Sequence, residues 1–337
     1  MRISASRALI GLFAASCALV LGGCSPQASQ PSDTLSSTPD VIASPTDTTP
    51  AQTVTLTDSS AISVTGDFNT SPVIDAPYPF QVDSTICTTL IQGTGNKVGP
   101  DSVVELQYTG VDAVSGYTFD ASFLNNQTLL GQNGYFVTGF NNCLTDQVSG
   151  SRVLMLITSS EGYDPDGNTD AGINPGDSLL FVVDIIAVQF DGPEGQQMAT
   201  GNQWVSVTDK DGVPTAKVNA GVSAPTDLQS VVLTQGTGRP VAASDAIYVN
   251  FFTMDYSTGA MIENSYTDGQ GPQVALLANL IPGWRQALVG VPMGSRVLII
   301  VPGKLAYPQG NASPSVTPNA TLVCVVDILF SFVPQSS

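Results

Sequence analysis

Residues 90–95 read LIQGTG, and residues 233–238 read LTQGTG, 143 positions further along the chain. The same spacing, to within one residue, separates GSRVL at residues 150–154 from GSRVL at residues 294–298. Unrelated sequences do not keep one register over so long a stretch, and a fixed period of this kind marks an internal repeat. The sequence therefore predicts two tandem copies of one domain.

A shorter match lies ahead of each copy, because residues 63–65 and residues 206–208 both read SVT. Each copy is therefore expected to carry an extension on the N-terminal side of its core. The expected segments are a signal peptide at 1–23, a disordered tether rich in Ser, Thr and Pro at 24–60, a first domain at 61–190, a linker at 191–204 and a second, more divergent domain at 205–334.

Apolar and polar side chains alternate along much of each copy, for example at residues 104–108 and 247–251. This period of two is typical of half-buried strands, and only one short stretch in each copy resembles a helix. The pattern predicts the α+β class, with an antiparallel β-sheet wrapped on one short α-helix in each domain. The other expected elements are apolar strands at 152–157, 179–188, 296–301 and 322–332 and helices at 140–148 and 284–288.

The N-terminus has the features of an export signal. Arg2 and Arg7 give the N-terminus a positive charge. The apolar run at residues 8–21 is shorter than a typical transmembrane helix. The run ends in LGGC at residues 21–24, which resembles the bacterial lipobox, where the cysteine is acylated and becomes the new N-terminus. Lipidated Cys24 would anchor the chain to the outer face of the cell membrane, or to an outer membrane if the cell has one. The alternative is an ordinary secretory signal in which Cys24 is incidental.

Composition narrows the range of functions. The 337 residues include 28 acidic and 10 basic ones, a net charge of −18, so the chain repels phosphate backbones and nucleic acid is not an expected partner. The sequence has no histidine and no paired CxxC, which sets aside a zinc site and a histidine-based triad. No metal or cofactor is expected. Residues 164–170 resemble a calcium loop, but Thr169 and Pro175 stand where glycine and glutamate are required, so an acidic surface loop is the better interpretation.

Three cysteines lie beyond the signal and the tether. Cys87 and Cys143 both fall in the first copy, and an oxidising compartment favours a disulfide between them. The alternative is two separate buried thiols. Cys324 lies in an apolar run and is expected to be a core residue.

The first copy carries a series of motifs in a fixed order. YTG at residues 108–110 is followed by FD at 119–120 and by FVTGF at 136–140. Tyr163 and Phe181 come next. In this order the motifs, from residue 90 to residue 188, resemble the FKBP-type peptidyl-prolyl cis/trans isomerases, and the chain resembles a lipoprotein with two tandem FKBP-like domains.

The resemblance implies a hydrophobic pocket that takes a proline ring. Phe140 would replace the floor tryptophan of the family, Val137 would offer its backbone N–H to a substrate carbonyl, and Tyr163 would place its hydroxyl over the pocket. Asp120 would sit at the rim near Tyr108. The segment between Asp120 and the helix is shorter than is usual in the family, which leaves one aromatic wall unassigned. The implied site consists of Tyr108, Phe119, Asp120, Val137, Phe140, Tyr163, Ile173 and Phe181.

The second copy departs further from the family pattern. Phe251 replaces the tyrosine, Glu263 the aspartate, and Cys324 the aromatic residue of the last strand, whereas Trp284 keeps the floor of the family. An apolar pocket with an altered polar rim is therefore expected. It is implied to consist of Phe251, Ile262, Glu263, Ile281, Trp284, Tyr307 and Val316.

Rotation about an X-Pro bond faces a barrier of ~18–20 kcal/mol and makes or breaks no covalent bond, so such a pocket needs no nucleophile, metal or histidine. The resemblance implies a membrane-tethered prolyl isomerase that acts outside the cytoplasm on proline-containing exported polypeptides, mainly through the first domain. Macrolides are a further class of ligand that it implies. The alternative is a peptide-binding module or holdase chaperone without catalysis, and a weaker one is a structural scaffold.

Overall fold

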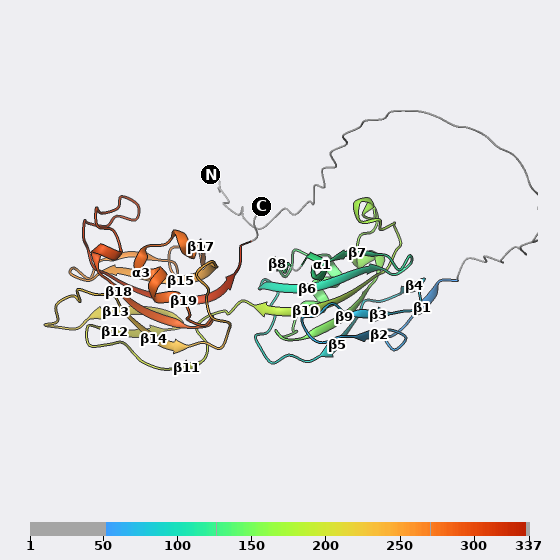
Figure 1. The fold of residues 1–337 in the computed structure, drawn as a ribbon, viewed down its shortest axis with the longest axis horizontal. Helices are drawn as coiled ribbons and strands as arrows, with labels where there is room; N and C mark the ends of the chain where they lie inside the picture. The colour runs from blue at the N-terminus through green and yellow to red at the C-terminus, as the bar shows by residue number, and fades with distance from the viewer. Residues whose placement is uncertain (1–51, 126, 270, 335–337) are drawn as a thin grey trace, which may run out of the picture.

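The computed structural model describes residues 52–125, 127–269 and 271–334. The expected signal peptide, Cys24 and the tether up to residue 51 lie outside these residues. Two β-rich domains follow one another along the chain, the first blue to green and the second yellow to red in Figure 1. In the part of the chain that the structure describes, no helix is long and apolar enough to cross a membrane.

The first domain is built on a six-stranded antiparallel sheet of order β5-β9-β10-β6-β7, in which β8 also pairs with β6. The central strands β9 and β10 are buried on both faces, which explains why their sequences are almost entirely apolar, except for Arg152 and Asp184. Both have the predicted bounds. The strands are β5 (Ile86–Ile91), β6 (Val103–Asp112), β7 (Thr118–Ala121), β8 (Leu129–Gln132), β9 (Arg152–Ile157) and β10 (Leu179–Val188).

The second domain repeats this sheet and adds one strand. Its order is β11-β14-β18-β19-β15-β16, and β17 pairs with β15. The central strands β18 and β19 again have the predicted bounds. The strands are β11 (Gln196–Gln197), β14 (Gln229–Gln235), β15 (Ala246–Asp255), β16 (Met261–Asn264), β17 (Gln273–Leu276), β18 (Arg296–Val301) and β19 (Leu322–Phe332).

Each sheet is covered on both faces. On one face of the first sheet, α2 (Thr138–Leu144) packs Phe140 and Leu144 against alternate residues of β9 and β10. On the other face the N-terminal extension packs Leu56 and Phe80 against the residues between them, because neighbouring side chains of a strand point to opposite faces. In the second domain, Figure 1 shows α3 (Pro282–Leu288) on one side of β18 and the extension on the other.

The extensions are larger than the SVT matches indicated. In the first domain β1 (Val54–Leu56) pairs in parallel with β4 (Phe80–Val82), and β2 (Ser63–Thr65) pairs with β3 (Val73–Asp75). In the second domain the extension is the hairpin of β12 (Val205–Lys210) and β13 (Val213–Val218). The prediction that the tether runs to residue 60 is therefore wrong, because Leu56 is buried and β1 is paired.

The prediction of a linker at 191–204 is also wrong. β11 pairs with β14, the N–H of Met198 donates to the carbonyl of Leu233 at 2.7 Å, and Trp204 packs against the core on the extension side. These partners are distant in sequence, so the polar composition of the segment concealed them. The second domain consequently begins before residue 205.

The helices differ slightly from the expected ones. α2 ends at Leu144 instead of residue 148, because Asp146 adopts a left-handed conformation with φ 68° and its N–H donates to the carbonyl of Val98. The expectation of one helix per domain is wrong for the first domain, which also contains α1 (Ser122–Asn125). Four residues are too few to show a helical period. α3 begins at Pro282 and ends at the predicted Leu288.

A buried ion pair fastens each extension to its sheet. The Arg152 side chain is 1% exposed, and its Nε and Nη2 donate to the two carboxylate oxygens of Asp184 at 2.6 and 2.7 Å. Its other donors reach the carbonyls of Gly66 and Thr70, in the loop between β2 and β3, at 2.7 Å each. The Asp184 carboxylate thus neutralises the charge of the guanidinium, and the remaining donors of Arg152 bind the extension.

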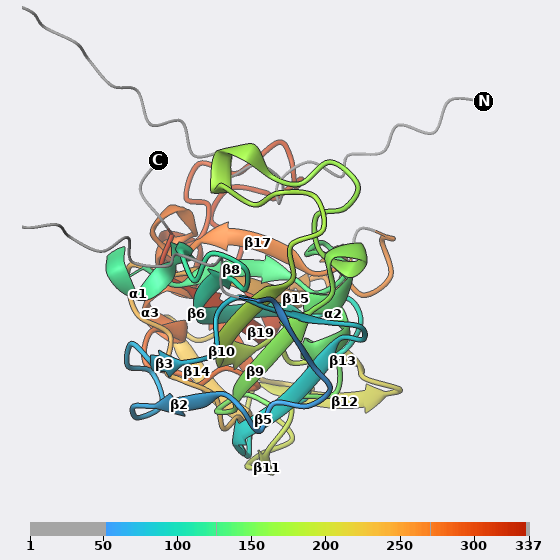
Figure 2. The same cartoon turned by 90° about the vertical axis from the view of Figure 1, so that its right-hand side faces the viewer.

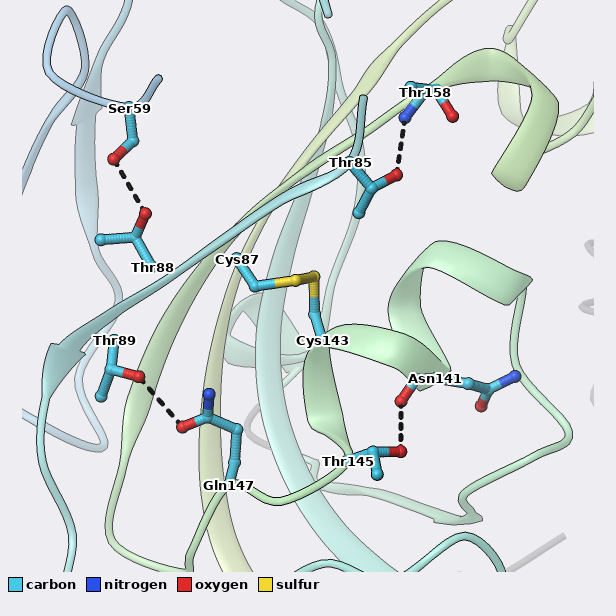
Figure 3. Close-up of a disulfide and its surroundings, with 10 residues drawn as sticks. All are labelled: Ser59, Thr85, Cys87, Thr88, Thr89, Asn141, Cys143, Thr145, Gln147 and Thr158. Atoms are coloured by element: carbon cyan, nitrogen blue, oxygen red, sulfur yellow. Dashed lines mark hydrogen bonds between the residues drawn. A yellow bond between two sulfur atoms is a disulfide. The ribbon is translucent and has the colours of Figure 1, made fainter. Parts of the chain in front are cut away.

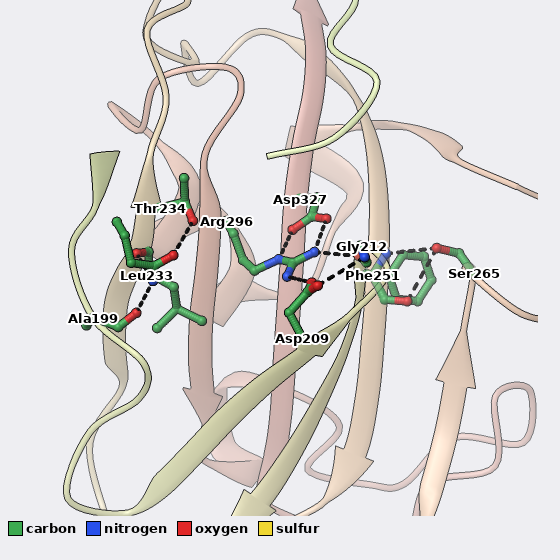
Figure 4. A network of polar contacts seen from close by, with 10 residues as sticks. Ala199, Asp209, Gly212, Leu233, Thr234, Phe251, Ser265, Arg296 and Asp327 are labelled. Atoms are coloured by element: carbon green, nitrogen blue, oxygen red, sulfur yellow. Dashed lines mark hydrogen bonds and ion pairs between the residues drawn. The ribbon is translucent and has the colours of Figure 1, made fainter. Parts of the chain in front are cut away.

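The second domain repeats the arrangement, as Figure 4 shows. Arg296 donates to both carboxylate oxygens of Asp327 at 2.6 and 2.8 Å and to the carbonyl of Gly212 at 2.7 Å. Asp209 of the hairpin forms a second ion pair with the same guanidinium. The repeated GSRVL motif thus provides the anchor of the extension in both copies.

Candidate functional site

The candidate site of the first domain lies on the helix side of its sheet. Tyr108 comes from β6, Phe119 from β7, Phe140 from α2 and Phe181 from β10. The Phe181 ring is at the centre, with centroids 5.5 Å from Phe119 and 5.1 Å from Phe140, both edge to face, and 6.4 Å from Tyr108. Aromatic pairs at these distances and angles attract one another beyond the effect of burial alone.

The remaining apolar residues of the predicted site join the same cluster. Ile173 is buried in the cluster, and Val137 and Tyr163 are half-buried at its surface. Tyr163 and Ile173 lie in the loop that follows β9, and the corresponding loop of the second domain follows β18. Figures 1 and 2 show both loops projecting from the same side of the molecule. The structure thus brings the predicted apolar residues of the first site together.

Close packing explains the glycine of the YTG motif. A Cβ atom at Gly110 would lie 2.7 Å from Phe181 Cε1 and 2.8 Å from Phe119 Cζ, closer than real Cβ contacts occur. Any larger residue would therefore displace the aromatic rings at the centre of the site.

Asp120 lies at the exposed rim, where its carboxylate accepts a hydrogen bond from the Tyr108 hydroxyl. Burial raises the pKa of Tyr108, and the hydrogen bond to Asp120 raises it further. The tyrosine therefore stays protonated at neutral pH and remains a donor to the carboxylate.

Two polar groups beside the apolar cluster are available to a ligand. Val137 precedes the first turn of α2 in an extended conformation, and its N–H makes no hydrogen bond to any residue that the structure describes. The Tyr163 hydroxyl likewise has no hydrogen-bond partner within residues 52–125, 127–269 and 271–334. Two donors beside an apolar surface suit the carbonyl groups of an extended peptide.

Phe136, which the sequence pattern did not assign to the site, is the candidate for the unassigned aromatic wall. Its ring centroid lies 5.0 Å from that of Phe140, and it is half-buried against the cluster. Gly131 of β8 leaves room for this ring, because a Cβ atom there would collide with it. The signal was present in FVTGF, where Phe136 stands in a position that the family fills with an aliphatic residue.

Asn141 of α2, also missed, holds the loop that carries Phe136. Its side-chain oxygen accepts from the N–H of Gly134 at 2.8 Å and of Phe136 at 3.2 Å, and its Nδ2 donates to the Phe136 carbonyl at 2.6 Å. A side-chain amide that satisfies three backbone groups fixes the conformation of the loop.

Replacing Asn141 with alanine is expected to lower kcat/KM for a prolyl peptide roughly tenfold, because the wall and the Val137 N–H are no longer held in place. The loss should appear mainly in KM, with the fold retained by circular dichroism. Asn142→Ala, one residue along the same helix at an exposed position, is the control. Equal activity of the two variants would contradict a positioning role for Asn141.

A disulfide fastens the helix of the site to the sheet. Cys87 of β5 is bonded to Cys143 of α2, with Cα atoms 5.3 Å apart, as Figure 3 shows. The sequence left open a disulfide or two separate buried thiols, and the structure contains the disulfide. The second domain has Ser230 and Ala287 at the corresponding positions and carries no such link.

The second domain assembles a related apolar site. Trp284, Val316 and Cys324 are buried, and the ring centroids of Trp284 and Phe251 lie 5.5 Å apart, edge to face. Burial raises the pKa of the Cys324 thiol to about 11, so it remains a neutral core group. The other predicted members are half-buried beside this floor, namely Ile262, Glu263, Ile281 and Tyr307.

In the acidic loop after Tyr163, side-chain oxygens accept hydrogen bonds from backbone N–H groups of the same loop. Asp164 accepts from the N–H of Gly176 at 2.7 Å, and Asn168 accepts from the N–H of Ala171 at 3.2 Å. No group of three metal-ligating side chains gathers among the described residues.

The fold agrees with the comparisons with known proteins. The family model of the FKBP-type peptidyl-prolyl cis-trans isomerases matches residues 95–186 and 238–329. These two stretches make up more than half of the chain, which therefore belongs to this family and carries two tandem FKBP domains.

Three curated relatives are similar to parts of the chain. FkpA of Escherichia coli, an FKBP-type peptidyl-prolyl cis-trans isomerase, is 32% identical over 114 residues, which are 34% of this chain and 41% of FkpA. A probable FK506-binding protein of Corynebacterium glutamicum is 30% identical, over 32% of this chain and 88% of the relative. The outer membrane protein MIP of Legionella longbeachae is 30% identical, over 32% of this chain and 46% of MIP. The match thus spans less than half the length of FkpA and MIP.

Proposed function

We propose that the chain is a membrane-tethered peptidyl-prolyl cis/trans isomerase that acts on X-Pro bonds of exported proteins, mainly through its first domain. The observation that carries the proposal is the aromatic cluster around Phe181, bordered by the Val137 N–H and the Tyr163 hydroxyl. Family membership and the names of the relatives support it.

The chemistry follows from the nature of the barrier. The planar amide owes its barrier to conjugation, and the twisted amide is less charge-separated than the planar one. An apolar aromatic surface formed by Phe119, Phe140 and Phe181 therefore favours the twisted form over a ground state solvated by water. The Val137 N–H and Tyr163 would hold substrate carbonyls while the bond turns. Asp120 would act electrostatically on the twisting group.

The first domain is the better candidate for catalysis because its rim is complete. Tyr108 and Asp120 are joined, and the disulfide holds α2. In the second domain Phe251 has no hydroxyl and Cys324 replaces the central ring.

Location outside the cytoplasm is supported by the signal at residues 1–23 and by the disulfide, since such bonds persist in oxidising compartments. Similarity to an outer membrane protein agrees with it. Lipidated Cys24 would supply the tether, and mass spectrometry of the mature N-terminus tests this. Similarity to a probable FK506-binding protein supports macrolides as ligands of the first domain.

Tyr163→Phe in the full chain is expected to lower kcat/KM for a prolyl tetrapeptide roughly fivefold, because one hydrogen bond of about 1 kcal/mol is lost in the transition state. Tyr307→Phe makes the same change in the second domain and should have a smaller effect. Tyr78→Phe, on the extension side of the sheet, is the control. A larger loss from Tyr307→Phe would contradict the leading role of the first domain.

The rival function is a holdase that binds proline-bearing segments without turnover, and the altered rim of the second domain favours it there. An isomerisation rate no higher than the uncatalysed one, together with suppressed aggregation of an unfolded client, would establish the rival.

A further inference from the structure

The second domain keeps the acidic position of the site and loses the hydroxyl that binds it in the first domain. Thr253 lies opposite Glu263 between β15 and β16, just as Gly110 lies opposite Asp120 between β6 and β7. Phe251 therefore stands where Tyr108 donates to the carboxylate in the first domain. A phenyl ring has no group to donate.

Glu263 consequently has no hydrogen-bond or ion-pair partner among the residues that the structure describes. Burial, and then the negative charge of Asp268, raise the pKa of its carboxyl group. Both effects mean that its negative charge is poorly compensated by the protein itself.

Two basic side chains of the second domain are paired with other carboxylates. Arg296 is bonded to Asp327 on the opposite side of the sheet, and Lys304 lies 3.2 Å from Asp227. The site of the second domain therefore combines an apolar surface with the Glu263 carboxylate, which forms no ion pair with any residue that the structure describes.

The carboxylate is close to the floor of the site. Thr253, which lies opposite Glu263, donates its hydroxyl hydrogen to Cys324 Sγ at 3.6 Å. Burial raises the pKa of Tyr307, and the charge of Glu263 raises it further. A ligand resting on Trp284 and Cys324 would thus place its neighbouring groups within reach of Glu263.

We propose that the second domain selects X-Pro segments with a lysine or arginine next to the proline, with the prolyl ring on Trp284 and the cationic group beside Glu263. This specificity rests on the proposed function of the chain. A cation would replace the hydroxyl partner that the first domain supplies from Tyr108, and a partly desolvated pair of charges is stronger than one in open water.

The chain itself provides a local probe, because its only tryptophans are Trp204 and Trp284. The full chain labelled with 5-fluorotryptophan gives one fluorine signal from the site and one from the extension side. We expect capped Ala-Lys-Pro-Phe to shift the Trp284 signal with a Kd roughly tenfold lower than that of Ala-Glu-Pro-Phe. Ala-Leu-Pro-Phe should fall between them, and added salt should narrow the difference.

Three variants isolate the carboxylate. Glu263→Gln is expected to bring the Lys/Glu ratio of affinities close to one while binding of the leucine peptide persists. Phe251→Tyr, which restores a hydroxyl beside Glu263, should lower the preference for lysine. Glu194→Gln removes the same charge from an exposed position outside the site and should leave the ratio unchanged.

Equal affinities for the three peptides would overturn the inference and leave prolyl-peptide binding by this domain intact. Failure of every peptide to shift the Trp284 signal would also overturn it. The isomerase activity of the full chain, measured with the Tyr163→Phe variant, decides the proposed function separately.

Discussion

Replacing Asp184 with asparagine is expected to lower the free energy of unfolding of the first domain by about 3–5 kcal/mol. The variant leaves the guanidinium of Arg152, 1% exposed, without its countercharge in the interior. It also weakens the bond from the N–H of Asn69 to Asp184, which helps to dock the extension. Guanidinium denaturation followed by far-ultraviolet circular dichroism measures the loss.

Asp146→Asn is the matched control, because the ion pair between Lys97 and Asp146 is exposed and such pairs contribute little. The double variant Arg152→Met with Asp184→Leu should recover most of the stability, since it removes both charges together. A loss below about 1 kcal/mol for Asp184→Asn would mean that water reaches Arg152 and that the pair does not hold the extension.

The double variant Cys87→Ser with Cys143→Ala is expected to destabilise the first domain by about 4 kcal/mol, because the disulfide closes a loop of 56 residues in the unfolded chain. The two substitutions introduce the residue types that the second domain has at the corresponding positions, Ser230 and Ala287. Both residue types therefore already occur at these positions of the fold. Denaturation curves with and without reductant measure the effect.

The second domain supplies the internal control for this experiment. Both tryptophans belong to it, so their fluorescence follows its unfolding alone, and that transition should not move. Reductant should destabilise the wild-type chain and leave the variant unchanged. A variant as stable as the oxidised wild type would show that the bond does not constrain the unfolded chain.

Much of the sheet could be predicted from the sequence. The bounds of β9, β10, β18 and β19 agree because strands buried on both faces are mostly apolar, apart from the paired charges that each of them carries. The short elements α1 and β11 could not be found, because four and two residues carry too little pattern.

The candidate site was predicted to a similar extent. Phe119, Phe140 and Phe181 were found through the order of their motifs, and the structure places their rings in contact. Phe136 and Asn141 were not found, because their roles depend on which ring and which backbone groups they meet. Side-chain contacts between distant segments leave no trace in local sequence.

The sequence by itself determined the duplication, the core strands and the residue types of both sites, because repeats and apolar runs are properties of the chain read in order. Only the tertiary structure decided where each domain begins, how Arg152 and Arg296 anchor the extensions, and that the Tyr108 hydroxyl meets the carboxylate of Asp120. Burial and charge compensation arise when residues far apart in the chain meet, so they exist only in the folded protein.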